Sequence, residues 1–257
     1  MQTLKTSTTG WVQTITLSRP DAKNAFNETM IAELREVFSA VPNSVRAVIL
    51  TGEGDAFCAG ADVNWMRDSA KRGESENRED AARMEAMFLA IDECPSPVIG
   101  KINGVALGGG IGLVACCDIA VAVDTAQFGF TEVRLGIVPA VISPYSLAKL
   151  GQAAARRYFL TGELFSAGEA RTIGLVHEVV TESSLNENVN RLAVALSKNG
   201  PMAVRTTKQL IREVVRMDRD EARAHTIATI ARIRTSAEGQ EGLSAFLEKR
   251  KPGWLEK

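Results

Sequence analysis

Two turns rich in small residues could bring free backbone amides to a reacting atom. The first is Phe57–Asp62, and the second runs from Gly104 to Leu113 and contains five glycines. Glycine lets the backbone approach a ligand closely, and unpaired N–H groups at the start of a helix stabilise a phosphate or a developing oxyanion. The same glycines could instead serve close packing of a helix on a strand, and Gly110-x-Gly112-x-x-Ala115 fits a dinucleotide-binding fingerprint only loosely.

Glu132 is the candidate for proton transfer. It lies in Gln127–Pro139, a segment that we expect to be extended, so that Phe128, Phe130 and Glu132 share one face. Aromatic neighbours would exclude water from the carboxyl group and raise its pKa towards the range that suits general acid–base catalysis. The alternative is an ion pair with Arg134, which lies on the same face of such a strand.

These candidates must be held by a fold in which strands and helices alternate, which is typical of an α/β core with parallel pairing. Two glycine-bearing turns that follow successive strands can converge at one end of a sheet and offer N–H groups to the same oxygen. We expect an α/β core over residues 1–198 and a helical C-terminal region over residues 199–257. The periodicity predicts strands at 11–17, 47–51, from 98 onward and 175–180, and helices at 27–41, 74–94, after 166, 184–199 and 202–217.

Composition excludes several classes of protein. The 257 residues carry 30 basic and 31 acidic side chains, which argues against a surface that binds nucleic acid. The four cysteines (Cys58, Cys94, Cys116 and Cys117) and the two distant histidines suggest neither a disulfide framework nor a metal site. Residues 1–10 are polar, and the apolar run 105–123 contains glycines and Asp118, so we expect a cytoplasmic protein without a membrane span.

Three segments together resemble the enoyl-CoA hydratase/isomerase (crotonase) superfamily. They are Phe57–Asp62, Asn103–Asp118 and Ala126–Pro139, and the match runs in the same order along essentially the whole chain. The resemblance implies a crotonase-like spiral of ββα units with a helical C-terminal trimerisation region, giving a homotrimer or a hexamer built as a dimer of trimers. It also implies an acyl-CoA substrate, with coenzyme A as part of that substrate and no separate cofactor or metal.

By position in these motifs, the resemblance implies that the amides of Ala61 and Gly109 polarise the thioester carbonyl and that Glu132 is one of two catalytic glutamates. Gly112 stands where the best-known hydratases carry the other glutamate. A hydratase with one carboxylate would use Glu132 both to activate water at the β-carbon and to return a proton to the α-carbon. A Δ3,Δ2-enoyl-CoA isomerase, which needs only one base, is the alternative.

A finer resemblance favours hydration. Bacterial methylglutaconyl-CoA hydratases of leucine degradation are similar at Asn64–Arg67, Gly112–Asp118, Ser143–Tyr145, Arg156–Thr161 and Gly174–Val179, and they tend to carry Gly at the place of Gly112. We therefore expect hydration of methylglutaconyl-CoA or a similar branched 2-enoyl-CoA. The carboxylate of such a substrate would need a partner, for which Arg134 and Tyr145 are candidates.

Only some of the family's other contacts to substrate or CoA have a matching residue in this chain. The resemblance assigns the CoA phosphates to Lys249 and places Ala25, Ala59, Asp62 and Met66, with Gly112, around the substrate. Where the family usually has an aromatic residue that accompanies this lysine, the chain has Ile230. Where the family usually has a basic residue just after the Arg-Pro turn, the chain has Asp21. One branch of the superfamily binds RNA through a lysine-rich helix, but the helix predicted at 27–41 has Arg35 as its only basic residue. RNA binding is therefore not expected.

Overall fold

Two β-sheets form the centre of the molecule, whose computed structural model describes residues 1–255. The larger sheet has the order β1-β2-β3-β5-β7-β10 and the smaller has the order β4-β6-β8-β9. Neighbouring strands are parallel except for β1 with β2 and β8 with β9. The strands are β1 (Leu4–Thr9), β2 (Val12–Leu17), β3 (Ala47–Gly52), β4 (Ala56–Cys58), β5 (Val98–Ile102), β6 (Val105–Leu107), β7 (Ile119–Val123), β8 (Gln127–Gly129), β9 (Leu164–Ser166) and β10 (Glu178–Val180).

The chain repeats one path three times: a strand in the larger sheet, a strand in the smaller sheet, then a helical segment. The repeats are β3–β4–α2–α3, β5–β6–α4 and β7–β8–η2–α5. This path confirms the predicted spiral of ββα units. Its helical segments are α2 (Val63–Ser69), α3 (Glu74–Asp92), α4 (Gly109–Cys116), the 3₁₀ helix η2 (Glu132–Leu135) and α5 (Ser143–Thr161).

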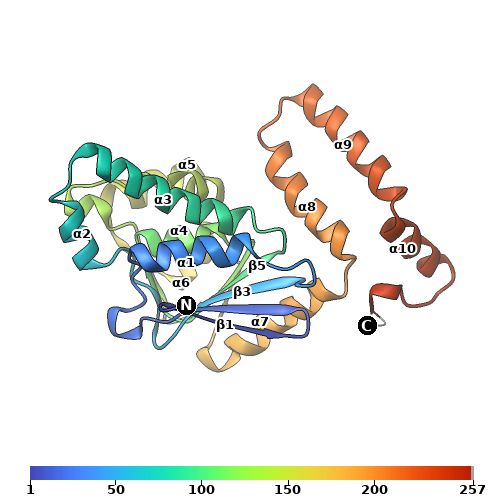
Figure 1. Cartoon of the computed structure of the whole chain (residues 1–257), viewed down its shortest axis with the longest axis horizontal. Helices are drawn as coiled ribbons and strands as arrows, with labels where there is room; N and C mark the ends of the chain where they lie inside the picture. Colours follow the sequence, from blue (N-terminus) through green and yellow to red (C-terminus); the bar gives the residue numbers. More distant parts are fainter. Residues whose placement is uncertain (256–257) are drawn as a thin grey trace.

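Helices cover both faces of the larger sheet. α1 (Glu28–Ser39), α3 and α4 lie on one face, and α7 (Glu182–Ser197) lies on the other (Figure 1). β3 and β7 are therefore nearly continuous apolar runs, as is typical of parallel strands buried on both faces, and β3 is buried from Ala47 to Thr51. As predicted, α1 begins after Asn27, whose side chain accepts a 3.0 Å hydrogen bond from the amide of Met30.

The C-terminal helices extend from the core as a separate layer (Figure 1). After α6 (Ala167–Thr172) and α7, they are α8 (Pro201–Val214), α9 (Arg219–Arg234) and α10 (Ala237–Leu247), followed by η3 (Gly253–Leu255). The expected boundary after residue 198 falls in the link between α7 and α8. Lys208 of α8 anchors this layer, because its buried ammonium group lies 2.7 Å from the carboxylate of Asp118, at the start of β7. No helix within residues 1–255 is long and apolar enough to span a membrane.

Residues 4–9, for which no strand was predicted, form β1, which pairs antiparallel with β2 although its own pattern is mostly polar and exposed. Three local predictions were wrong. The strand expected at 175–180 is ordered as β10 only over its last three residues, and α7 starts at Glu182 rather than at Ser184. The extended segment expected through residue 139 ends at Gly129, and Glu132 begins the 3₁₀ turn η2. Glu132 therefore does not share a strand face with Phe128 and Phe130.

Candidate functional site

Three neighbouring parallel strands of the smaller sheet end at one place. β4, β6 and β8 are hydrogen-bonded side by side, and Ala61, Gly109 and Glu132 follow their last residues by two or three positions. Ligands commonly bind at the carboxyl ends of parallel strands. The fold thus brings together the three residues to which the sequence assigns chemistry, and η1 (Pro20–Ala22) leads into the segment that packs beside them.

The two turns lie against each other. A Cβ built on Gly60 would lie 2.7 Å from the carbonyl oxygen of Leu107 and 3.6 Å from the amide nitrogen of Gly109. Both turns use backbone with positive φ, +90° at Gly60 and +49° at Gly108, which side chains disfavour. Within residues 1–255, the amides of Ala61 and Gly109 donate to no backbone acceptor. Two free N–H groups on adjacent turns are the donors that an oxyanion hole requires.

The carboxyl group of Glu132 faces the second turn. A Cβ on Gly108 would lie 3.2 Å from Glu132 Oε1, and the amide of Gly108 donates to the carbonyl of Gly129 (2.9 Å), which ties this turn to the segment that carries the glutamate. Burial raises the pKa of Glu132 above its ordinary value. Its Oε2 is buried and has no hydrogen-bond partner in the described chain. The predicted alternative, an ion pair with Arg134, is not formed among these residues.

Apolar side chains fill the space next to Gly112, where the second family glutamate would start. A Cβ on Gly112 would overlap Ile142 Cγ2 and lie 2.8 Å from Phe88 Cε1. Ile142 and Phe88 are both fully buried or nearly so. Among the described residues, the carboxyl group that faces the second turn is that of Glu132, and the wall at Gly112 is hydrocarbon.

Four of the other predicted contacts lie around the first turn. Ala25 accepts a hydrogen bond from Arg19 Nη1 (2.5 Å), and the amide of Ala59 donates to the carbonyl of Lys23 (3.0 Å), so the Arg-Pro turn packs on the Phe57–Asp62 turn. Asp62 caps α2 by accepting from the amides of Asn64 and Trp65. Met66 is half-buried on α2, one turn beyond the cap.

The carboxylate of Asp62 is fully engaged by the protein. Its Oδ2 lies 2.8 Å from Arg19 Nη2. Burial alone would raise its pKa, but Arg19 and the two α2 amides lower it below the ordinary value. Asp62 is thus an anion held in place at the start of α2, and its substrate contact stays a prediction.

The structure does not bring the other three predicted residues to the turns. The exposed side chain of Arg134 lies against Gly162 at the end of α5, where a Cβ would be 3.2 Å from Arg134 Cγ. The hydroxyl of Tyr145 lies 3.4 Å from a carboxylate oxygen of Glu85, and burial raises the pKa of this tyrosine. Lys249 follows α10, which lies on the opposite side of the core from α2 (Figure 1).

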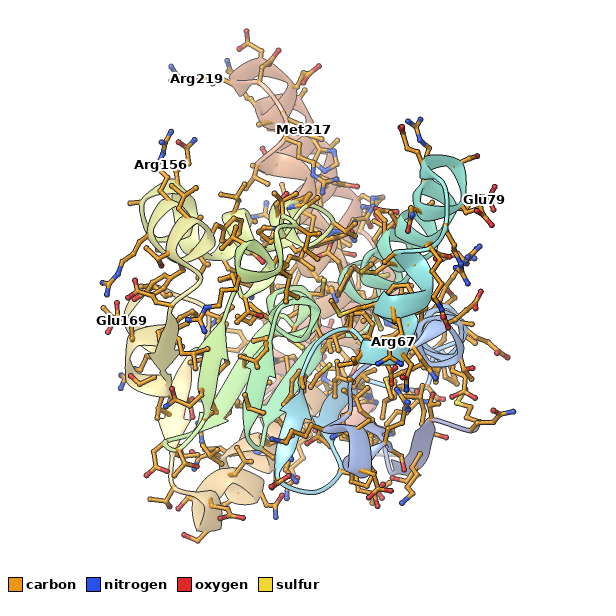
Figure 2. All side chains as sticks on the ribbon, turned by 90° about the vertical axis from the view of Figure 1, so that its left-hand side faces the viewer. Arg67, Glu79, Arg156, Glu169, Met217 and Arg219 are labelled. Atoms are coloured by element: carbon orange, nitrogen blue, oxygen red, sulfur yellow. The ribbon has the colours of Figure 1, made fainter. Side chains whose placement is uncertain are left out.

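Two aromatic residues near the turns were missed by sequence reasoning. Phe26 is fully buried, and its ring centroid lies 6.4 Å from those of both Trp65 and Phe88. Trp65 lies on α2, whose exposed side carries Arg67 (Figure 2), and its indole Nε1 is buried with no acceptor in residues 1–255. An unpaired buried donor was not foreseeable from the sequence, because pairing depends on contacts distant along the chain.

Neither a metal site nor a reactive thiol competes with this site. Within residues 1–255, no group of three metal-ligating side chains is present. All four cysteines are buried and free, and burial raises the pKa of Cys58 and Cys117 to about 12, which disfavours the reactive thiolate.

Known proteins match the chain over nearly its full length. The family model described as "Enoyl-CoA hydratase/isomerase" matches residues 7–257. The crotonyl-CoA hydratase of Syntrophomonas wolfei is 36% identical over 94% of this chain and 93% of its own, and the mevalonyl-coenzyme A hydratase of Aspergillus fumigatus is 34% identical over 93% and 90%. A crystal structure of an enoyl-CoA hydratase from Shewanella pealeana is 39% identical, covers 98% of this chain and 96% of its own, and superposes with a TM-score of 0.93.

Proposed function

This chain belongs to the enoyl-CoA hydratase/isomerase family, and from that membership we propose that it hydrates a branched 2-enoyl-CoA, either 3-methylglutaconyl-CoA or a similar thioester. At the general level the activity is enoyl-CoA hydration. The observation that carries the proposal is one buried carboxyl oxygen without a partner, Glu132 Oε2, beside the two free amides of Ala61 and Gly109.

In the proposed reaction, the thioester oxygen accepts hydrogen bonds from the amides of Ala61 and Gly109. Glu132 takes a proton from water as the water oxygen bonds to the β-carbon, and the electrons of the double bond pass to the thioester oxygen as an enolate. The enolate then re-forms the carbonyl as the α-carbon takes that proton from Glu132. The amides stabilise charge that exists only during the reaction, which is where binding accelerates a step. No cofactor beyond the CoA of the substrate is required.

The apolar side chains around Gly112 are the observation that favours the isomerase alternative. With Ile142 and Phe88 in that space, a water on this side of the double bond would have no second carboxylate to hold it. A Δ3,Δ2 isomerisation needs no water, because Glu132 would move one proton from the α-carbon to the γ-carbon. Hydration remains the first proposal, because relatives named as hydratases cover this chain almost end to end.

We further propose that Trp65 donates a hydrogen bond to a polar group of the acyl chain. A buried indole N–H without an acceptor costs about 1–3 kcal/mol, and a substrate oxygen would remove that cost. Arg134, whose side chain lies against Gly162, and Tyr145, whose hydroxyl lies 3.4 Å from Glu85, remain the alternative partners for this group. The fungal relative is named for mevalonyl-coenzyme A, a branched acyl group that carries oxygen.

We also propose that the protein assembles as a trimer or as a pair of trimers. The end of α8 and the last turn of α10 carry apolar side chains that are largely uncovered in the described chain: Val215, Phe246 and Leu247 are 79%, 81% and 78% exposed. A second copy would cover them, and it could bring its own Lys249 towards the CoA phosphates. Cytoplasmic location remains a prediction.

An absorbance assay on the purified protein tests the activity. The substrates are 3-methylglutaconyl-CoA, 3-methylcrotonyl-CoA, crotonyl-CoA and a 3-enoyl-CoA. Loss of enoyl-thioester absorbance, greatest with 3-methylglutaconyl-CoA, is expected. A gain of absorbance with the 3-enoyl-CoA and no loss with the others would assign the enzyme as an isomerase instead.

The Trp65 proposal has its own matched comparison, because 3-methylglutaconyl-CoA and 3-methylcrotonyl-CoA differ by one carboxylate. Trp65→Phe keeps the ring and removes the N–H group. It is expected to lower kcat/KM for the first substrate by roughly tenfold to a hundredfold and to leave the second within about twofold. Equal losses on both substrates would refute the contact, and Trp11→Phe, whose tryptophan stacks on Arg46, serves as the control.

A further inference from the structure

We infer that Phe26 is a positioning residue: it fixes the separation of the two oxyanion amides without touching the thioester. The inference rests on the proposed function, since it concerns the same oxyanion hole. Phe26 contacts both turns, the first with its backbone and the second with its ring.

The backbone of Phe26 holds the turn that carries Ala61. Its amide donates to the carbonyl of Gly60 (2.8 Å), and its carbonyl accepts from the amide of Asp62 (3.0 Å). Phe26 and Ala61 thus form an isolated parallel bridge outside the sheets. These two bonds secure the residues on either side of Ala61 and leave its own N–H unpaired, which is the state that binding of a thioester oxygen requires.

The ring of Phe26 supports the turn that carries Gly109. A Cβ built on Gly109 would overlap Phe26 Cζ, so the tip of the ring occupies the place of that missing side chain. The ring is fully buried and is flanked by Trp65 and Phe88, each 6.4 Å away between centroids. The flanking rings restrict its rotation, because interiors are packed at crystal-like density.

The spacing of the two amides therefore depends on the length and stiffness of this side chain, together with the direct packing of Gly60 against Leu107. From backbone to Cζ, phenylalanine has only two rotatable bonds, and here both are restricted by packing. Leucine would keep the backbone bonds and leave a void beneath Gly109, which would free the second turn to move. Displacement by about 1 Å in an active site can cost on the order of a hundredfold in rate, because an oxyanion hole acts through preorganised donors.

Phe26→Leu tests this role against Phe38→Leu. Phe38 is a 1% exposed phenylalanine at the end of α1, so its truncation removes the same volume of core away from the turns. Both variants are expected to lose similar thermal stability. Only Phe26→Leu is expected to lower kcat on crotonyl-CoA, by about tenfold to a hundredfold, with KM within about threefold. Equal kcat values in the two variants would overturn the inference.

A spectroscopic measurement separates this role from the hydratase proposal. A push–pull chromophoric thioester such as 4-dimethylaminocinnamoyl-CoA absorbs at longer wavelength when its carbonyl is polarised, whether or not the enzyme turns it over. The wild type and Phe38→Leu should shift its spectrum, and Phe26→Leu at saturation should shift it less. A full shift in Phe26→Leu would refute positioning even if the wild type hydrates no enoyl-CoA.

Phe26→Met covers the case in which Phe26→Leu does not fold. Methionine restores the reach of the side chain towards Gly109 but not its stiffness. Phe26→Met is expected to fold. Its kcat and its spectral shift should lie between those of Phe26→Leu and the wild type. If Phe26→Leu does not fold, both values for Phe26→Met should still lie below those of the wild type. Wild-type values for Phe26→Met would show that a rigid ring is not what sets the amides, which would overturn the inference.

Discussion

Replacing Glu132 with glutamine should remove the activity and stabilise the protein at neutral pH. The carboxyl group lies beside Gly108, with Oε2 buried and unpaired within the described chain, and burial raises its pKa. Glutamine has nearly the same shape, so the two glycine turns should stay in place. The substitution therefore tests proton transfer rather than packing.

The loss of activity follows from the role of a single base. A positioned general acid–base group contributes about 10²–10⁴ in rate. Within residues 1–255, Ile142 and Phe88 fill the space at Gly112 and leave no room for a second carboxylate there. We therefore expect kcat to fall by at least about a hundredfold, with KM for the enoyl-CoA little changed, because the amides of Ala61 and Gly109 remain to bind the thioester oxygen.

The gain in stability follows from the sign of the pKa shift. The pKa of Glu132 is higher in the folded protein than in the unfolded chain. Between those two values the folded state retains a proton that the unfolded state has lost, so stability falls as the pH rises through this window and stays lower above it. Glutamine never ionises, and the variant should escape this loss.

Two measurements on the same preparations test the reasoning. Turnover of crotonyl-CoA and the midpoint of thermal unfolding are recorded from pH 4 to pH 8, in steps of about half a unit, which spans the ordinary carboxyl range. Glu163→Gln is the control, because Glu163 pairs with Arg157 at the end of α5, away from the turns. Near-normal kcat in Glu132→Gln would refute the assignment of the base, and a lower midpoint at pH 7 would refute the sign of the shift.

Three further predictions concern the residues that hold the site. Gly112→Glu should lower the unfolding free energy by about 1–3 kcal/mol through overpacking and should not raise kcat, as denaturant titration and the absorbance assay can check. Asp62→Ala removes the α2 cap and should cost about 0.5–2 kcal/mol, with a larger drop in kcat than Asn27→Ala, which removes the cap of α1. His177 accepts a hydrogen bond from the amide of Ala120, and burial lowers its pKa below 6.5. Stability should therefore fall as the pH drops below about 6.5, and His177→Gln should show a flatter pH dependence of the unfolding midpoint.

The sequence predicted those parts of the site that depend on local backbone chemistry. Clustered glycines can be recognised without a structure, since few other residues adopt the φ of +90° seen at Gly60. Apolar periodicity likewise located β2, β3, the start of β5 and the stripe of α1, but it did not separate the buried strand β7 from the apolar run before it. Family resemblance then connected the two turns with Glu132, and the parallel strands β4, β6 and β8 explain why residues far apart in sequence meet.

What the sequence could not predict depends on long-range packing. Glu132 was expected on a strand because aromatic residues alternate up to it, but β8 ends at Gly129 and the chain turns into η2. Phe26 reads as an ordinary core residue, because nothing local indicates that its ring will replace the side chain of Gly109. The hydrocarbon that excludes a second carboxylate comes from Phe88 of α3 and from Ile142, directly before α5, and both lie far from Gly112 in sequence.

The polar groups of this site are of two kinds: some form hydrogen bonds within the protein, and others have no partner in the described chain. Buried Asp62 and half-buried Arg19 pair with each other and with the protein around them, so they need nothing from a ligand. Glu132 Oε2 and Trp65 Nε1, like the amides of Ala61 and Gly109, have no partner that the described chain supplies. Each such group costs about 1–3 kcal/mol when buried. Because several of these groups lie in one region, binding free energy is most favourable for a molecule that supplies matching oxygens and an acidic proton. An enoyl thioester with its attacking water fits that description.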